Sequence, residues 1–215
     1  MTMRLDAYTH FFPKKFFDKL NEVAGDHKDM GKRVRSLPAL YDLDFRKKIV
    51  DGFKDYQQIL SYPQPPIERF AKNPRDIDEF CKIINDGFVE LCAKEKDHFP
   101  GWVAQVALGA PDAGVREAER AIKELGALGV QIYTNVAGKP IDLPEYAPFW
   151  AKMNELGKPV WILNRFDACW RWMADREDSP WYPSVRLFQQ MAPGDWAGVV
   201  QRVKDELSLL PTAAG

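Results

Sequence analysis

The sequence contains few cysteines, three among 215 residues. Cys81 and Cys92 lie eleven positions apart in one predicted helix. At the helical rise per residue their Cα atoms would be roughly 16 Å apart, which excludes a disulfide or a shared metal ion. We interpret both as buried free thiols, and Cys169 as unpaired. This cysteine usage predicts a reducing compartment, and we expect a cytoplasmic protein.

The sequence also lacks an excess of basic residues and any long apolar run. Lys and Arg total 30 against 31 for Asp and Glu, so nothing favours binding to a phosphate backbone. No stretch of about 18 apolar residues occurs, and residues 1–6 do not resemble the start of a secretory signal. We therefore expect neither a nucleic acid partner nor a membrane span.

What the sequence does contain is enough apolar residues, 46%, for a hydrophobic core, arranged in alternating short runs and helical periods. The predicted strands are 3–8, 57–62, 102–108, 129–133 and 159–163. The predicted helices between the later strands are 74–92, one opening at Asp112, and one from 146 to 156. Asn73 and Pro74 provide an N-cap and a first-turn proline for the first of these helices. Such alternation is typical of parallel sheets, either doubly wound or in a (β/α)₈ barrel.

Residues from 164 onward differ in composition, since six of the seven tryptophans lie after residue 149. The alternation of strands and helices is expected to stop there. Residues 176–183 read as an ordered loop, and a final helix is predicted after Gly194 and Asp195. We therefore predict two parts, a partial barrel over 1–163 and an unrelated tail over 164–215.

One strand end carries a candidate metal ligand. Alternation along an extended strand puts Asp6, Tyr8 and His10 on the same side, so Tyr8 and His10 would point together toward a barrel mouth. Catalytic metal sites use His or carboxylate side chains on a rigid scaffold and leave one position open. His27 and His98 lack a Cys, Asp or His at ligand spacing, and we interpret both as surface residues.

Four blocks of sequence together resemble a known family. They are Asp6 to His10, Ile59 to Pro66, Gly129 to Pro140 and Gly157 to Ile162, spread over residues 3–162. In this order they resemble the amidohydrolase-related family of aminocarboxymuconate semialdehyde decarboxylase and the resorcylate-type decarboxylases. The resemblance implies a (β/α)₈ barrel of the TIM type, here incomplete with about five βα units. It also implies a divalent metal ion, usually zinc and in some members manganese, and chemistry on small aromatic or unsaturated carboxylic acids.

The resemblance assigns roles to individual residues. His10 matches the second histidine of the family's His-x-His pair, and Tyr8 stands where many members have the first. Leu163 stands where members have the histidine that ends the fifth strand, and the family's later histidine and aspartate have no counterpart. Tyr is a poor zinc ligand at neutral pH and Leu cannot bind metal. We predict His10 as a metal ligand and Tyr8 and Asn135 as substrate-binding residues, although a turn role for Asn135 is left open.

The tail has a resemblance of its own. Residues 164–210 resemble the extreme C-terminus of bacterial glycosyltransferases that carry tetratricopeptide repeats, and this would make the chain a chimera joined near residue 163.

Two functions of the chain remain open. One is a metal-dependent carboxy-lyase or hydrolase with a small carboxylic acid substrate. The other is a nonenzymatic fragment or fusion product that associates through exposed barrel edges, because open edges of a parallel sheet invite pairing.

Overall fold

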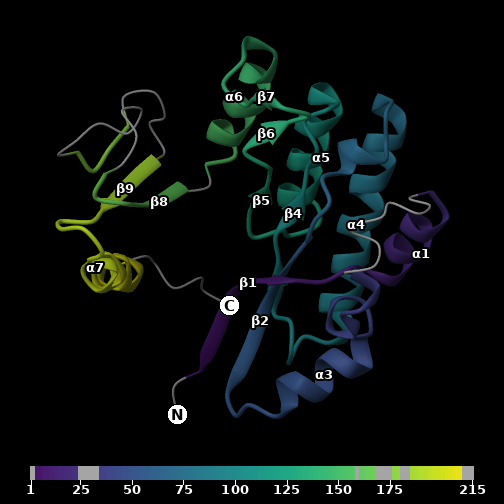
Figure 1. Cartoon of the computed structure of the whole chain (residues 1–215), viewed down its shortest axis with the longest axis horizontal. Helices are drawn as coiled ribbons and strands as arrows, with labels where there is room; N and C mark the ends of the chain where they lie inside the picture. Colours follow the sequence, from purple (N-terminus) through teal and green to yellow (C-terminus); the bar gives the residue numbers. More distant parts are fainter. Residues whose placement is uncertain (1–2, 24–33, 158–159, 168–175, 180–184, 210–215) are drawn as a thin grey trace. The chain divides into compact units, whose positions relative to one another are not determined.

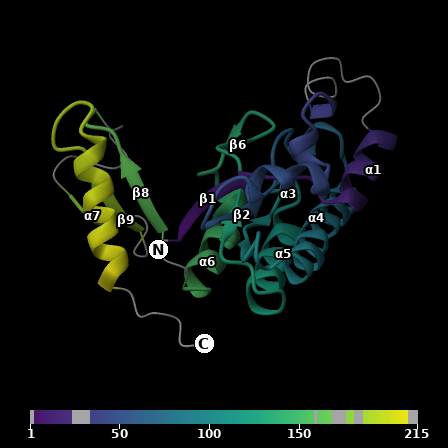
Figure 2. The same cartoon turned by 90° about the horizontal axis from the view of Figure 1, so that it is seen from below.

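The structure is a computed structural model that describes residues 3–23, 34–157, 160–167, 176–179 and 185–209. The chain forms two compact units, unit 1 over Met1–Leu156 and unit 2 over Gly157–Gly215. Figures 1 and 2 show the elements of both units in two views. None of the described helices is long and apolar enough to cross a membrane.

Unit 1 alternates strands and helices, as predicted. Its elements in chain order are β1 (Arg4–His10), α1 (Lys14–Val23), η1 (Pro38–Leu40), α3 (Leu43–Asp51), β2 (Tyr56–Ser61), η2 (Ile67–Arg69), α4 (Pro74–Lys94), β3 (Gly101–Trp102), β4 (Ala104–Gln105), α5 (Pro111–Lys123), β5 (Val130–Gln131), β6 (Asn135–Val136), β7 (Lys139–Pro140), η3 (Pro144–Tyr146) and α6 (Ala147–Glu155).

The strands of unit 1 are parallel and adjacent in chain order, apart from one hairpin. β1 pairs with β2, β2 with β3, and β4 with β5, all in parallel, whereas β6 and β7 form an antiparallel hairpin. The third predicted strand, 102–108, is shorter than expected and interrupted at Val103, whose N–H still bonds to the carbonyl of Leu60 at 2.8 Å. The interruption marks the point where this segment changes partner from β2 to β5. Sequential parallel pairing with helical crossovers is the topology of a TIM-type barrel.

Helix α4 is the best predicted element. The Asn73 side chain accepts a hydrogen bond from the backbone N–H of Asp76 at 2.9 Å, as the N-cap prediction requires. The buried face includes Ile77, Phe80 and Ile84. Figure 1 shows α4 running beside the strands with α1 and α5 as neighbours, and α4 contacts both of these helices. The apolar stripe thus covers one face of the sheet.

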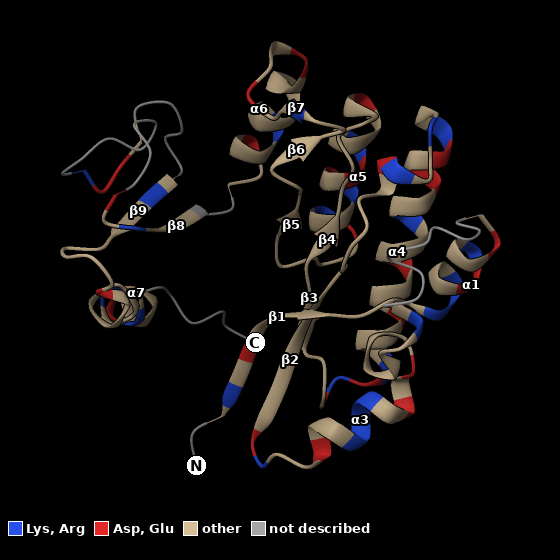
Figure 3. Cartoon of the chain, viewed as in Figure 1, with Lys and Arg blue, Asp and Glu red and all other residues tan. Residues whose placement is uncertain are grey.

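The main core of unit 1 lies between the sheet and these helices and is rich in aromatic rings. Phe16 is fully buried, with ring centroids 5.2 Å from Tyr62, 5.8 Å from Phe80 and 5.9 Å from Phe12. Such pairs add about 0.5–1.5 kcal/mol each beyond the burial of apolar surface. Strands β2 to β5 contain no charged residue, whereas the helices carry both signs (Figure 3).

Unit 2 contains β8 (Val160–Asn164), β9 (Val185–Gln189) and α7 (Trp196–Leu209). β8 matches the fifth predicted strand, although residue 159 lies outside the described residues. The expectation that alternation stops after residue 164 is wrong, because β9 pairs with β8 in parallel over five residues and α7 follows it. In the predicted loop, residues 180–183 lie outside the described residues, while the Glu177 carbonyl accepts a hydrogen bond from Leu187 N at 2.8 Å.

The final helix begins at Trp196, after Gly194 and Asp195, as predicted. Its N-terminus is capped by Asp195, whose Oδ1 accepts a hydrogen bond from Gly198 N at 2.9 Å. Two adjacent apolar residues of this helix differ in burial, since Val199 is completely buried but Val200 is 56% exposed. The helix therefore packs through a narrower face than its sequence pattern indicates.

Candidate functional site

The candidate site lies where β1 and β2 end side by side. The register pairs Thr9 with Leu60 and His10 with Ser61, after an irregularity in β1 between Asp6 and Thr9. Carboxyl ends of neighbouring parallel strands are where TIM-type barrels place their catalytic residues. Strand β1, which carries the predicted metal ligand, therefore places His10 at the carboxyl edge of the sheet, as expected.

Hydrogen bonds fix the tautomer of His10. Its Nδ1 lies 2.9 Å from Ser61 Oγ, and the Ser61 hydroxyl lies 2.8 Å from the carbonyl oxygen of Thr9. Because a carbonyl only accepts and a hydroxyl has one proton, Ser61 donates to Thr9 and must accept from His10. The proton of a neutral His10 is therefore on Nδ1, and Nε2 carries a free lone pair. Metal-binding imidazoles are commonly oriented in this way by a hydrogen bond from the other ring nitrogen.

The surroundings of His10 favour the neutral imidazole. Partial burial, and then the positive charge of Arg46, lower the pKa of His10, while Asp6 acts in the opposite direction. Arg46 is held nearby because its Nε donates to Gln58 Oε1 at 2.8 Å. A neutral imidazole keeps its lone pair available to a Lewis acid.

Tyr8 and His10 come together, as strand alternation predicts. Their ring centroids are 4.8 Å apart in an edge-to-face arrangement, and Tyr8 is 60% exposed. The carboxylate of Asp6 accepts hydrogen bonds from Tyr56 Oη at 2.8 Å and from the backbone N–H of Tyr8 at 3.3 Å. Asp6 is thus engaged in holding β1 against β2.

The described residues do not form a complete metal site. No group of three or more His, Cys, Asp or Glu side chains within the described ranges could hold a metal ion. His10 is the only predicted ligand, and Leu163, which lies in β8 of unit 2, is apolar and 44% exposed. The donor set in the described part of the chain therefore does not fit a tightly bound catalytic metal, which needs three protein ligands.

Asn135 lies at the start of the β6–β7 hairpin in unit 1. Its Oδ1 accepts a hydrogen bond from Gly138 N at 3.0 Å, and Ala137 and Gly138 both have positive φ angles, 49° and 86°. This is the turn geometry left open as the alternative role. Asn135 is exposed, and contact with a substrate stays a prediction.

Two further predictions concerned the other histidines. His27 lies outside the described residues. His98 is not a plain surface residue, because its Nε2 lies 2.8 Å from Asp51 Oδ1 and its Nδ1 lies 3.6 Å from Glu95 Oε2. Spacing along the sequence could not reveal Asp51, which is 47 positions away.

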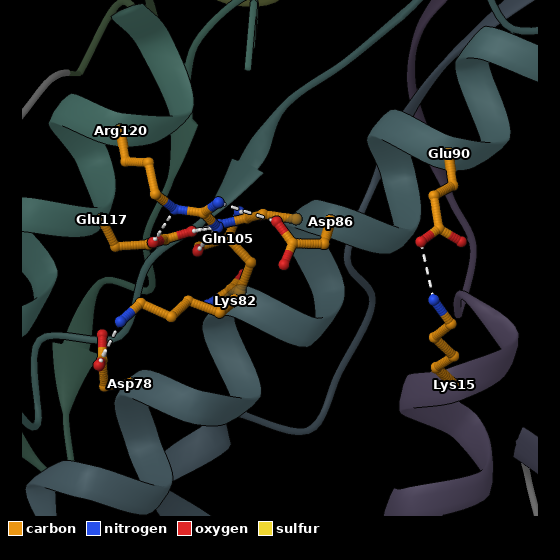
Figure 4. A network of polar contacts seen from close by, with 9 residues as sticks. Lys15, Asp78, Lys82, Asp86, Glu90, Gln105, Glu117 and Arg120 are labelled. Atoms are coloured by element: carbon orange, nitrogen blue, oxygen red, sulfur yellow. Dashed lines mark hydrogen bonds and ion pairs between the residues drawn. The ribbon is translucent and has the colours of Figure 1, made fainter. Parts of the chain in front are cut away.

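A buried polar network beside β4 was not predicted either (Figure 4). The completely buried Asn85 on α4 accepts from Gln105 N at 2.8 Å and donates to Gln105 O at 3.0 Å. It also donates to Glu117 Oε1 at 2.7 Å, and Glu117 in turn is bound by Arg120 at 2.8 Å through two nitrogens. The segment that contains β3 and β4 pairs with β2 only at β3. At β4 the Asn85 amide thus makes the backbone hydrogen bonds to Gln105 that a neighbouring strand would otherwise make. Every charged member has a partner within the network, so its role is structural.

The fold and the position of His10 at a strand end together define the class of protein. It is a TIM-type α/β protein with a histidine at the carboxyl end of its first strand. A family model described as Amidohydrolase matches residues 7–195. The chain belongs to the amidohydrolase-related family that includes the resorcylate-type decarboxylases.

Individual relatives agree with this assignment. The chain is 33% identical to gamma-resorcylate decarboxylase of Rhodococcus jostii (strain RHA1) over 131 residues, 57% of this chain and 39% of that protein. It is 28% identical over 177 residues to 2-amino-3-carboxymuconate-6-semialdehyde decarboxylase of Dictyostelium discoideum, covering 75% of this chain and 48% of that one. The chain thus spans about half the length of the curated relatives it matches, or less.

Solved structures show the same fold. Dihydroxybenzoic acid decarboxylase from Polaromonas sp. JS666, with bound manganese and the inhibitor 2-nitroresorcinol, is 27% identical with a TM-score of 0.55, covering 75% of this chain and 49% of that one. For 2,6-dihydroxybenzoate decarboxylase from Rhizobium the identity is 22% and the TM-score 0.59, covering 99% of this chain and 74% of that one. The family match, residues 7–195, runs past residue 164, where the predicted tail begins.

Proposed function

We propose that this chain belongs to a metal-dependent carboxy-lyase or hydrolase that acts on small aromatic or unsaturated carboxylic acids. The observation that carries the proposal is the lone pair of His10 Nε2, oriented by Ser61 at the carboxyl edge of the sheet. Similarity to gamma-resorcylate decarboxylases and to a manganese-bound dihydroxybenzoic acid decarboxylase supports the substrate class and the metal. We propose zinc as the metal, with manganese as the alternative, and a cytoplasmic location.

For the reaction, we assign to the described residues only the positioning of the His10 imidazole. Ser61 and Thr9 hold the His10 ring, and Tyr8 contacts it edge to face. Partial burial and the positive charge of Arg46 lower the pKa of His10 and so favour its neutral form. We derive no reaction step through a metal, because one imidazole does not make a metal site. Further ligands would have to come from residues outside the described ranges or from another chain. We propose accordingly that the barrel of this chain is incomplete.

Metal analysis of the purified chain tests the proposal. If residues outside the described ranges or another chain complete the site, dialysed protein should hold about one zinc or manganese per chain, lost in His10→Ala and retained in the matched variant His98→Ala. Release of carbon dioxide from 2,6-dihydroxybenzoate, measured with the same three proteins, tests the activity separately. Metal-free protein at micromolar added zinc or manganese would contradict the metal assignment.

A second candidate function is favoured by the edge strand. Among the described residues of unit 1, β1 pairs only with β2, and Leu5 and Tyr8 on β1 are 53% and 60% exposed. We propose that a nonenzymatic form of the chain associates through this edge, because unpaired strand edges template pairing with another chain. Light scattering should show a mass that rises with concentration and falls to the monomer in Leu5→Lys. A monomer at all concentrations would contradict association.

The proposed chimera and its boundary at residue 163 need their own tests. Sequencing of the coding DNA across codon 163 would reveal a misjoin or frameshift. Limited proteolysis should cut between about residues 163 and 195 and leave a stable N-terminal piece, if the tail is a separate part. Uniform protection of that region would instead indicate one integrated fold.

A further inference from the structure

Helix α3 of unit 1 carries an apolar stripe that is open to solvent. The stripe consists of Phe45 and Ile49 on the helix and Phe53 in the turn that follows, which are 44%, 42% and 55% exposed. The opposite side of the helix faces the end of α4, where Lys47 forms an ion pair with Glu95 at 2.7 Å. Residues four positions apart form the ridge through which two helices most often pack on each other. The stripe therefore has the pattern of a packing surface, although its side chains stay largely exposed.

One end of the stripe adjoins the start of β1. The turn after α3 is bound to that strand, since Arg4 N donates to the carbonyl oxygen of Asp55 at 2.7 Å and Arg4 Nη2 donates to that of Lys54 at 2.8 Å. Leu5, which follows Arg4 in β1, is 53% exposed. The stripe and the first residues of the β1 edge are thus neighbours, at the end of the strand opposite to His10.

Two charged residues flank the stripe in an order that fits a second copy of the chain. Asp44 and Lys48 each precede a residue of the stripe by one position, so both lie on the same flank of the helix. Both are exposed, and no ion pair within the described part of the chain involves either of them. If two copies of α3 pack antiparallel across a twofold axis, Phe45 faces Ile49 of the second copy and Asp44 faces its Lys48. This ion pair then occurs twice, whereas parallel packing would bring like charges together.

We propose that the partner of unit 1 is a second copy of this chain, bound through antiparallel packing of α3 on α3. This inference rests on the association proposed for the β1 edge, and it adds the identity of the partner and the contact between the helices. A twofold contact uses the same surface on both copies and closes at the dimer, which is why its charge pattern must be complementary to itself. Only three apolar side chains of each α3 segment enter the contact, so the dimer is a weak one.

Sedimentation equilibrium of the full chain at low ionic strength, from about 10 μM to about 1 mM, tests this contact. Ile49→Lys should weaken dimerisation by about tenfold or more, because it places a charge in the centre of the apolar contact. Asp44→Lys and Lys48→Glu should each weaken it by about fivefold or more, because each creates two like-charge contacts. The double variant restores opposite charges and should dimerise within about twofold of the unchanged chain. Arg116→Glu, the same charge reversal at an exposed position of α5, is the matched control and should change dimerisation by less than about twofold.

The possible failures of this inference can be told apart. A dimer that persists in Ile49→Lys but is lost in Leu5→Lys would overturn the α3 contact and leave association at the β1 edge standing. Single charge variants that the double variant does not restore, or an equal effect of Arg116→Glu, would overturn the antiparallel pairing. A monomer up to about 1 mM would contradict the association itself, and this inference with it. Circular dichroism checks folding, and the charge variants test the contact if Ile49→Lys does not fold.

Discussion

Units 1 and 2 differ in how they satisfy buried polar groups. In unit 1 the side chain of Asn85 makes three hydrogen bonds and completes the pairing of β4. Among the described residues, three buried side-chain atoms of unit 1 have no partner, His98 Nδ1, Gln105 Oε1 and Gln131 Oε1. Unit 2, which is much shorter, has four: Asn164 Nδ2, Ser179 Oγ, Gln189 Oε1 and Gln190 Nε2. A buried polar group stabilises a fold only when it is paired, so the same residue type should contribute differently in the two units.

Asn85→Leu and Asn164→Leu test this difference most directly and should show the largest effect. Asn85→Leu leaves the backbone N–H and C=O of Gln105 without partners, and we expect a loss of about 3 kcal/mol or more in the free energy of unfolding. Asn164→Leu removes an amide whose Nδ2 has no acceptor, and we expect a change below about 1 kcal/mol. Hydrogen exchange of peptides from α4 and from β8 and β9 measures each unit separately. Equal losses in the two variants would contradict the comparison.

A glycine in unit 1 shows how tightly its helices pack. A Cβ at Gly87 on α4 would lie 2.4 Å from Cβ of Pro13, whereas a Cβ at Gly129 meets no atom within 4 Å. We expect Gly87→Ala to destabilise unit 1 by about 1–3 kcal/mol, because overpacking must shift the chain before α1. Gly129→Ala is the matched control and should change stability by less than about 0.5 kcal/mol. Urea denaturation of both variants measures the effect, and similar midpoints would contradict it.

The smallest expected effect concerns the cysteines of unit 1, which are free, as predicted. Burial raises the pKa of Cys92 to about 12, and burial also raises the pKa of Cys81. At pH 8 only about one Cys92 side chain in ten thousand is a thiolate, so both thiols should react slowly with Ellman's reagent until urea is added. The Cys169→Ser background removes the thiol outside the described residues. Rapid reaction of native protein in that background would show that α4 opens more easily than its packing indicates.

Predictions from the sequence were best where neighbouring residues decide the structure. Helix α4 was predicted from the Asn73 cap, the first-turn Pro74 and an apolar stripe, all of them local signals. β9 was missed because its partner, β8, lies more than twenty positions earlier and the intervening residues have no regular pattern. The interruption at Val103 was missed because it reflects a change between two neighbouring strands, which short-range patterns do not record.

In the candidate site, too, contacts within one strand were predicted and contacts between distant segments were not. The alternation of β1 places Tyr8 and His10 on one side, and their rings indeed meet. The role of Ser61 was not foreseen, although it lies within the second block of family resemblance, because its hydroxyl reaches His10 across 51 positions of sequence.

The alternation of strands and helices in unit 1, the capped α4 and the position of His10 at a strand end follow from the amino-acid sequence alone, since caps and periodicity act within a few residues. The tautomer of His10, the pairing of Asn85 with β4 and the unpaired donors of unit 2 were decided only by the tertiary structure. Each depends on atoms from segments far apart in the chain. Their hydrogen bonds exist only once packing has brought those segments within about 3 Å.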